Sequence, residues 1–170
     1  MDFEDPEIPA WFWPVIDAAG HRLDVLEAWL TNQPKDVVVA YGQAYIVAAA
    51  DLVENYFADG VLVDGDVWSE DSTQDLCTWV VGQGRALWAR VASGDLPLSD
   101  AAQIYLGRVP GTVPWTLDAS GVATTKSPWR IECTVYWNRF DEELLEVLNS
   151  NEILFGGPPD VEPESLPVVA

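Results

Sequence analysis

The residues with the clearest chemical potential are acids that cluster in one stretch of the chain. Asp59, Asp64, Asp66, Glu70 and Asp71 all lie between positions 59 and 71, and carboxylate oxygens are the ligands that hard cations such as Ca²⁺ prefer. Their spacing is not that of an EF-hand, which needs ligands at alternate positions, a central glycine and a closing glutamate. We therefore expect no metal site and interpret the acids as a solvated turn that caps a helix, with a specific Ca²⁺ or Mg²⁺ site as the alternative.

Nucleophilic catalysis would need a base, usually histidine, beside a serine or cysteine. His21 is the only histidine, and both Cys77 and Cys133 are far from it in the sequence. The stretch 82–85, GQGR, lacks the preceding strand and the Lys-Ser or Lys-Thr pair of a phosphate-binding loop. Carboxylate pairs for acid–base chemistry are not specific in a chain with 28 acids. The sequence therefore assigns no catalytic residue and no cofactor.

Three tryptophans lie in the segment 109–137, which is rich in Pro, Gly, Thr and Ser, and Arg130 and Arg139 are close to two of them in the sequence. Aromatic residues and arginine are enriched at binding surfaces, but tryptophan also anchors loops to a core, and both interpretations stay open. Together with the acidic turn, this segment supplies the candidate partner-binding residues, which are Asp64, Asp66, Glu70, Asp71, Trp115, Trp129, Arg130 and Trp137.

Net charge narrows the class of partner. The 28 acids and eight bases give a formal net charge of −20, and the bases are scattered singly along the chain. No basic cluster could follow a phosphate backbone, so we expect no direct nucleic-acid binding. A field of this sign attracts cationic partners, although it also serves to keep a Trp-rich protein soluble.

Three functions remain open on these grounds. The first is a non-enzymatic interaction protein that binds a basic protein, in the manner of bacterial immunity or inhibitor proteins. The second is a DNA-mimicking inhibitor, which would need carboxylates spaced like phosphates along one surface. The third is a small-molecule or metal-binding domain or a small enzyme, which would need a concave pocket with convergent polar groups.

The element pattern predicts a mainly α fold in one domain over residues 10–155, with a small extended or hairpin segment near 109–137. A long helix should begin after Pro34 and end before Gly60. Because it is apolar on nearly all sides, it should be the central helix. Ser72 should cap the next helix, which we expect to run through Gly82 and Gly84 to Val91. The full set of expected helices is 10–19, 23–32, 35–58, 72–91, 98–106 and 141–149.

Gly82 and Gly84 lie inside the expected helix 72–91, where each should reduce helix stability by about 1 kcal/mol relative to alanine. We predict that Gly84 offsets its cost by letting the helix approach the alanine run 48–50 of the central helix closely. In the last helix, the acids at 141–143 should stand at the N-terminus, where the helix dipole favours them.

Both ends of the chain have a different composition. Residues 1–9 and 156–170 are rich in Pro, Gly and acids, so we expect a flexible N-terminus and a disordered C-terminal tail. The longest uncharged stretch, 37–50, is too short to cross a bilayer. The acidic start is unlike a secretory signal, and two isolated cysteines suit a reducing compartment. We therefore expect a cytoplasmic protein with no membrane contact.

Two segments, FWPVID at 12–17 and SEDSTQDLCTWVVGQGRALWARVASG at 69–94, resemble the bacterial domain-of-unknown-function family 4240. Members of that family share an early Phe-Trp helix, an Ala-rich central helix, an acidic Ser-Asp-Asp turn and a helix with a Trp-Leu-Ile motif and a Gln-Gly pair. The resemblance covers roughly residues 11–100 and departs from the family in the turn, which lacks the usual cysteine. It implies a mostly helical fold and supplies no catalytic residues. The matching positions here are Phe12-Trp13, Ser69-Glu70-Asp71, Trp79-Val80-Val81 and Gln83-Gly84-Arg85.

Overall fold

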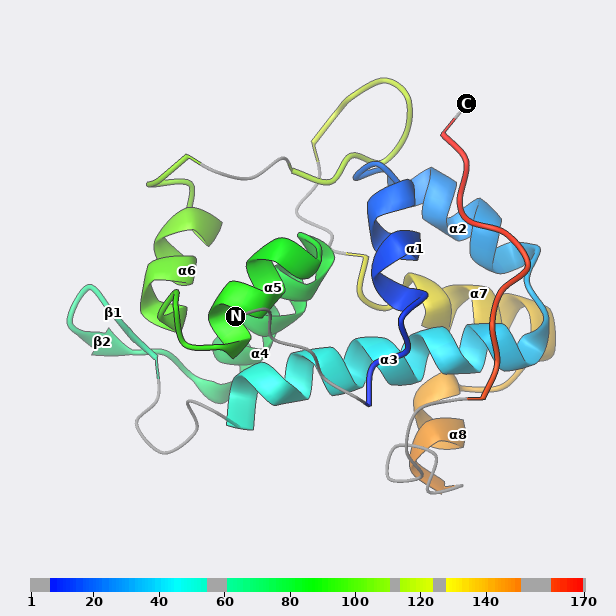
Figure 1. Ribbon diagram of the computed structural model, residues 1–170, viewed down its shortest axis with the longest axis horizontal. Coiled ribbons are helices and arrows are strands. Elements are labelled where there is room, and N and C mark those ends of the chain that lie inside the picture. The colour runs from blue at the N-terminus through cyan, green and yellow to red at the C-terminus, as the bar shows by residue number, and fades with distance from the viewer. Residues whose placement is uncertain (1–6, 55–60, 111–113, 124–127, 151–159, 170) are drawn as a thin grey trace.

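One long helix, α3 (Lys35–Glu54), organises the molecule. A computed structural model describes residues 7–54, 61–110, 114–123, 128–150 and 160–169. Tyr41, Tyr45 and Ala48 of α3 are fully buried, as expected for a helix that is apolar on nearly all sides. Figure 1 shows two groups of helices along it, with α4, α5 and α6 toward its C-terminal end and α2, α7 and α8 toward its N-terminal end.

The described residues contain eight helices, which confirms the predicted mainly α fold. Four of the expected helices, 10–19, 23–32, 98–106 and 141–149, are found within three residues of their predicted limits. The expected helix 35–58 begins at Lys35 as predicted, and its predicted end lies outside the described residues. The helices besides α3 are α1 (Phe12–Ala18), α2 (Leu23–Thr31), α4 (Glu70–Gly82), α5 (Arg85–Ala92), α6 (Leu98–Tyr105), α7 (Ile131–Phe140) and α8 (Leu144–Ser150).

The hairpin of named strands lies before the segment 109–137, which was expected to hold a small extended or hairpin segment. It is formed by β1 (Leu62–Val63) and β2 (Asp66–Val67), which pair antiparallel with Leu62 opposite Val67. The turn between them is Asp64-Gly65, with φ values of 55° and 85°, and such a two-residue turn matches the twist of antiparallel strands.

The stretch 131–137, expected to be extended, instead lies in α7, so this part of the prediction is wrong. Its β-branched residues favour strands only weakly. The helix buries Glu132, Val135 and Tyr136 at helical spacing and packs against α2 and α3. Tertiary burial of one helical face therefore outweighs local propensity here.

The expected helix 72–91 is in fact two helices. Gly84 separates α4 from α5 with φ +107°, a backbone conformation that residues other than glycine rarely adopt. A Cβ on Gly84 would stand 3.0 Å from Asp17 Oδ1, so the predicted packing of Gly84 on the alanines of α3 is wrong. Instead, α5 reaches α3 through Trp88, whose indole N–H donates to the Ala48 carbonyl at 2.9 Å.

The N-terminus of α4 also differs from the prediction. Ser69, rather than Ser72, is the N-cap, and its hydroxyl oxygen accepts the backbone N–H of Ser72 at 3.1 Å. The first turn then carries Glu70 and Asp71, where the helix dipole favours negative charge. The acidic turn thus caps a helix, as expected, with the start three residues earlier.

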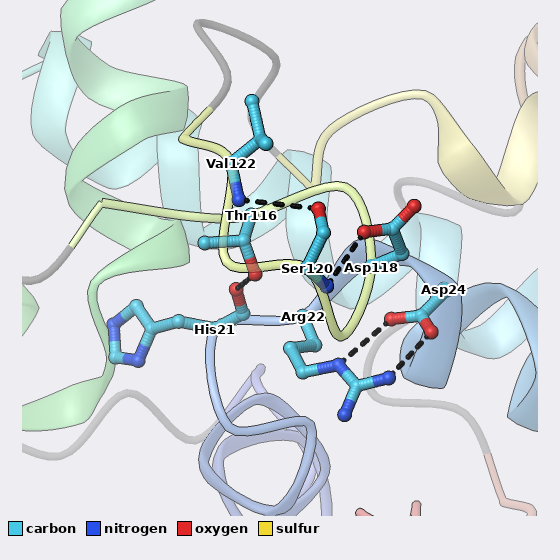
Figure 2. A network of polar contacts seen from close by, with 7 residues as sticks. All are labelled: His21, Arg22, Asp24, Thr116, Asp118, Ser120 and Val122. Carbon is cyan, nitrogen blue, oxygen red and sulfur yellow. Dashed lines mark hydrogen bonds and ion pairs between the residues drawn. The ribbon is translucent and has the colours of Figure 1, made fainter.

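Residues 114–123 form a loop fixed to the link between α1 and α2 (Figure 2). The Thr116 N–H donates to the His21 carbonyl at 2.8 Å, and the Thr116 carbonyl accepts from Leu23 N–H at 2.9 Å. Within the loop, Ser120 N–H donates to Asp118 Oδ1 at 2.9 Å. The extended conformation in this loop is limited to two isolated bridges, one between Thr116 and Arg22 of the α1–α2 link and one between Thr116 and Ala123 within the loop.

The chain ends expected to be flexible make contacts where they are described. Ile8 is buried in the core, and residues 160–169 lie against the α1–α2 region through hydrogen bonds from Trp11 and Trp29. Composition alone does not anticipate this, because the indole donors belong to residues far away in the sequence. Residues 1–6 and 156–159 lie outside the described residues. No helix within the described ranges has both the length and the apolar composition needed to cross a membrane.

Candidate functional site: an acidic pocket beside Trp137

A pocket of about 390 Å³ lies where the end of α7 meets α8. Its lining combines one indole with four carboxylates, and we call it the acidic pocket. Its residues are Trp137, Asp141, Glu142, Glu143, Glu146 and Val147.

The pocket exists because the chain reverses direction sharply after α7. Asp141 adopts a left-handed conformation with φ 53°, and its backbone N–H donates to the Trp137 carbonyl at 2.9 Å. The short helix α8 then returns with Leu144 and Leu148 buried. Leu144 packs so closely on α3 that a Cβ at Gly42 would stand 2.9 Å from Leu144 Cδ2. Because one side of α8 is held in the core, Glu143 and Glu146 remain exposed.

One carboxylate of the pocket is held in place by its neighbours. Lys35 Nζ lies 3.3 Å from Glu142 Oε1, and the Tyr136 hydroxyl donates to Glu142 Oε2 at 3.4 Å. The Lys35 ammonium also lies over the rings of Tyr136 and Phe140, at 5.6 and 5.0 Å from their centroids. The hydrogen bond to Glu142 raises the pKa of Lys35. This wall of the pocket therefore already binds one primary ammonium group between carboxylate and aromatic rings.

Two more acids of the lining, Asp141 and Glu143, offer the same chemistry to a cation. Asp141 and Glu143 are exposed and make no ion pair with any described residue. Trp137 leaves 50% of its surface exposed, and the face of an indole is the strongest aromatic site for a cation. Among the described residues, no group of three His, Cys, Asp or Glu side chains could hold a metal ion. An exposed indole face beside carboxylates suits an organic cation such as ammonium or guanidinium.

The acids predicted from the turn lie elsewhere. Asp64 and Asp66 are on the hairpin and Glu70 and Asp71 are in the first turn of α4, all exposed. Asp64 pairs with Arg108 at 2.7 Å. In Figure 1 the hairpin stands beyond α6, at the opposite end of α3 from α8. The turn acids and Trp137 are therefore on separate parts of the surface.

The tryptophans of the predicted binding segment differ in burial: one is buried, one is half-buried and one is half-exposed. Trp115 is buried, and its indole N–H donates to the Gly82 carbonyl at 2.9 Å, which favours the interpretation of Trp115 as a loop anchor over that of a partner-binding residue. Trp129 is half-buried, with its ring 5.2 Å from that of Tyr45. Arg130 is exposed in a left-handed conformation before α7. Trp137 is the one of the three tryptophans with a large exposed area.

Sequence reasoning missed most of this pocket. Asp141, Glu142 and Glu143 were interpreted only as favourable charges at a helix N-terminus, and Glu146 was not considered. The available signal was the local pattern WNRFDEELLEV at 137–147, in which four acids follow an exposed tryptophan within three helical turns. That the acids and the indole share one hollow depends on the left-handed turn at Asp141, which the pattern alone does not reveal.

One buried carboxyl has unusual properties but no access to solvent. Glu132 is fully buried, and burial raises its pKa to about 7. Its Oε1 accepts from Arg130 N–H at 3.3 Å, while Oε2 and the hydroxyl of Tyr41 have no hydrogen-bond partner among the described residues. A group with a perturbed pKa indicates a functional site only where a substrate can reach it. We therefore treat Glu132 as a core residue.

The potential nucleophiles are equally unsuited to catalysis at neutral pH. Burial raises the pKa of both Cys77 and Cys133 to about 12, so both thiols stay protonated and the reactive thiolate is scarce. His21 lies beside Trp115, with ring centroids 5.3 Å apart, and burial lowers its pKa although Asp17 acts in the opposite direction.

Comparison with known proteins finds no matching family model, no matching curated protein and no matching solved structure. The resemblance to family 4240 therefore stays a prediction.

Proposed function

We propose that this chain is a non-enzymatic interaction protein that binds a basic partner protein, and that the acidic pocket receives a lysine or arginine side chain of that partner. The observation that carries the proposal is the exposed indole of Trp137 in a hollow whose polar lining residues are four carboxylates. A cation on an indole face gains about 0.5–2 kcal/mol, depending on how far it is desolvated. Carboxylates around the ring add attraction and orientation.

The charge distribution supports the same class of partner. Arg22, Lys35 and Arg108 are already paired with acids, and Arg139 donates to the carbonyls of Leu30 and Gln33 at the end of α2. The net charge of −20 already counts all eight bases, so pairing each base with one acid still leaves twenty acids without a basic partner. Such a field speeds the encounter with a basic protein. The same properties suit an immunity- or inhibitor-type protein, and they disfavour direct nucleic-acid binding.

A charge-neutral substitution separates a real pocket from general attraction between opposite charges. We expect Trp137→Ala to weaken binding of a labelled tetra-arginine peptide by about 2- to 30-fold, which corresponds to the cation–π range at roughly 1.4 kcal/mol per tenfold. Binding is measured by fluorescence anisotropy at low and high salt. The matched control is Tyr105→Ala, which removes an aromatic ring that is 39% exposed on α6 and should leave the affinity unchanged.

A second pair of variants distinguishes the pocket from the acidic turn. Glu143→Gln/Glu146→Gln and Asp66→Asn/Asp71→Asn each remove two negative charges from exposed positions. We expect the first pair to weaken peptide binding more than the second and to reduce its dependence on salt. If Trp137→Ala has no effect and both double variants act equally, binding follows total charge and the proposed pocket is wrong.

The partner itself would be sought by purifying tagged protein from its host at low salt, in wild-type and Trp137→Ala forms. A stoichiometric basic protein that is retained by the wild type and lost by the variant would support the proposal. A partner that both forms retain equally would place the interface elsewhere.

A further inference from the structure

The C-terminal residues 160–169, which we call the strap, lie along the α1–α2 region without forming a helix or a strand (Figure 1). Trp11 donates its indole N–H to the Val161 carbonyl at 2.8 Å. Trp29 donates its indole N–H to the Ser165 carbonyl at 3.0 Å. Two indoles that are 18 positions apart in the chain thus contact carbonyls four residues apart in the strap.

Apolar contacts add to these hydrogen bonds. Val161 packs against the core and Pro167 is buried. Val169 lies at Gly20, where a Cβ would stand 3.0 Å from Val169 Cγ2. By contrast, the acids Glu162 and Glu164 are exposed. The strap therefore presents two carbonyls, Val161 and Pro167 to the protein, whereas its acids and the side chains of Leu166 and Val168 are exposed.

The manner of attachment is that of a bound peptide rather than of a structural element. No backbone–backbone hydrogen bond joins the strap to any other described residue, so it does not extend a sheet or a helix. Tryptophan-lined surfaces that hold extended, proline-containing segments by their carbonyls are a recurrent mode of peptide recognition. Proline at 163 and 167 lowers the entropy that such a segment loses on binding.

We propose that the surface formed by Trp11, Gly20 and Trp29 is a peptide-binding site for an extended, proline-containing segment, and that the strap is its ligand, bound in cis. The strap keeps the site closed to a second segment of the same kind. This is a second interaction surface, independent of the acidic pocket. A tethered ligand acts at an effective concentration of about millimolar, so a peptide in trans competes poorly until the strap is weakened.

The test uses the full chain with a weakened strap. The triple variant Val161→Ser/Pro167→Ser/Val169→Ser removes the apolar contacts of the strap and leaves the surface of α1 and α2 unchanged. The probe is a fluorescent peptide with the wild-type sequence of residues 160–169, and the control peptide carries the same three serines. Binding is measured by anisotropy at about 0.15 M salt, where screening limits repulsion between the acidic peptide and the acidic protein.

We expect the wild-type peptide to bind the triple variant at least tenfold more tightly than it binds the wild-type protein, and the serine peptide to bind neither. Adding Trp29→Phe to the triple variant keeps an aromatic ring but removes the donor to Ser165, and it should weaken peptide binding severalfold. Circular dichroism checks that each variant is folded.

Three results would overturn the proposal. The first is a folded triple variant that does not bind the peptide. The second is Trp29→Phe without effect on binding. The third is a triple variant that fails to fold, which would show that the strap is an inseparable part of the core. The triple variant should remain monomeric. If two wild-type chains exchanged their intact straps, light scattering would show a dimer, and this result would support recognition in trans.

Discussion

The ring of Pro128 lies against Gly82, so closely that a Cβ on the glycine would stand 2.8 Å from both Pro128 Cγ and Cδ. The hydroxyl of Tyr45 would be 3.3 Å from the same atom, and that hydroxyl already donates to the Thr78 carbonyl at 2.6 Å. Gly82 thus ends α4 where a proline ring and a tyrosine of α3 converge. A small residue is required because neither neighbour can easily move.

Gly82→Ala should therefore destabilise the protein although alanine is the better helix former. The gain in helix propensity is about 1 kcal/mol, whereas forcing a methyl group into a packed site costs about 1–3 kcal/mol. We expect a lower midpoint of urea denaturation. In a Pro128→Ala background the same substitution should cost less, because the ring that it contacts is gone. An equal stabilisation in both backgrounds would contradict the packing argument.

Two serines at the start of α4, Ser69 and Ser72, should contribute unequally to stability because only Ser69 is the N-cap. Ser69→Ala removes the acceptor for Ser72 N–H, and losing an N-cap costs about 0.5–2 kcal/mol. Ser72→Ala removes only a hydroxyl that contacts Ser69 Oγ at 3.1 Å, so we expect a much smaller loss. Thermal denaturation of the two variants measures the difference. If Ser72→Ala were the less stable of the two, Ser72 rather than Ser69 would be the cap.

These cases show which features a sequence can reveal and which it cannot. Pro34 and the apolar faces predicted α3 because helix signals are local. The helical state of 131–140 was missed because its β-branched residues favour strands locally, while its stability comes from packing against α2 and α3. The hairpin at Asp64-Gly65 carried a recognisable turn signal that was interpreted only as acidic charge. The acidic pocket required the placement of α8 on Gly42, which is a long-range contact.

Trp115 and Trp137, both in the segment 109–137, should differ in how much stability the protein loses when each is replaced by phenylalanine. Trp115→Phe removes the donor to the Gly82 carbonyl, an acceptor at the end of α4 that has no later residue of that helix to bond to. Leaving such a buried group unpaired costs about 1–3 kcal/mol. Trp137→Phe changes a half-exposed side chain and should stay within about 0.5 kcal/mol of the wild type. Urea denaturation of both variants is the measurement, and equal losses would contradict the assignment of Trp115 as the loop anchor.

Glu132 should make the free energy of unfolding fall as the pH rises, whereas a surface acid in an ion pair makes it rise. Burial raises its pKa from 4.5 to about 7 in the folded protein, so the folded state holds a proton that the unfolded state has already released. Its contribution is therefore fully present below pH 4.5 and is lost as the pH rises through about 7. The groups coupled to it are Tyr41 and Tyr45 of α3, Cys133, and the Arg130 side chain and N–H.

We expect Glu132→Gln to be more stable than the wild type at pH 8 and to lose this advantage at pH 4.5, because glutamine stays neutral in the same space. Each pKa unit corresponds to about 1.4 kcal/mol, so the advantage at pH 8 should amount to a few kcal/mol. Urea denaturation across this pH range measures it, with the exposed Glu143→Gln as the control for the loss of one negative charge. A stability difference between Glu132→Gln and wild type that does not change with pH would mean that Glu132 is ionised in the folded core throughout, held by Arg130.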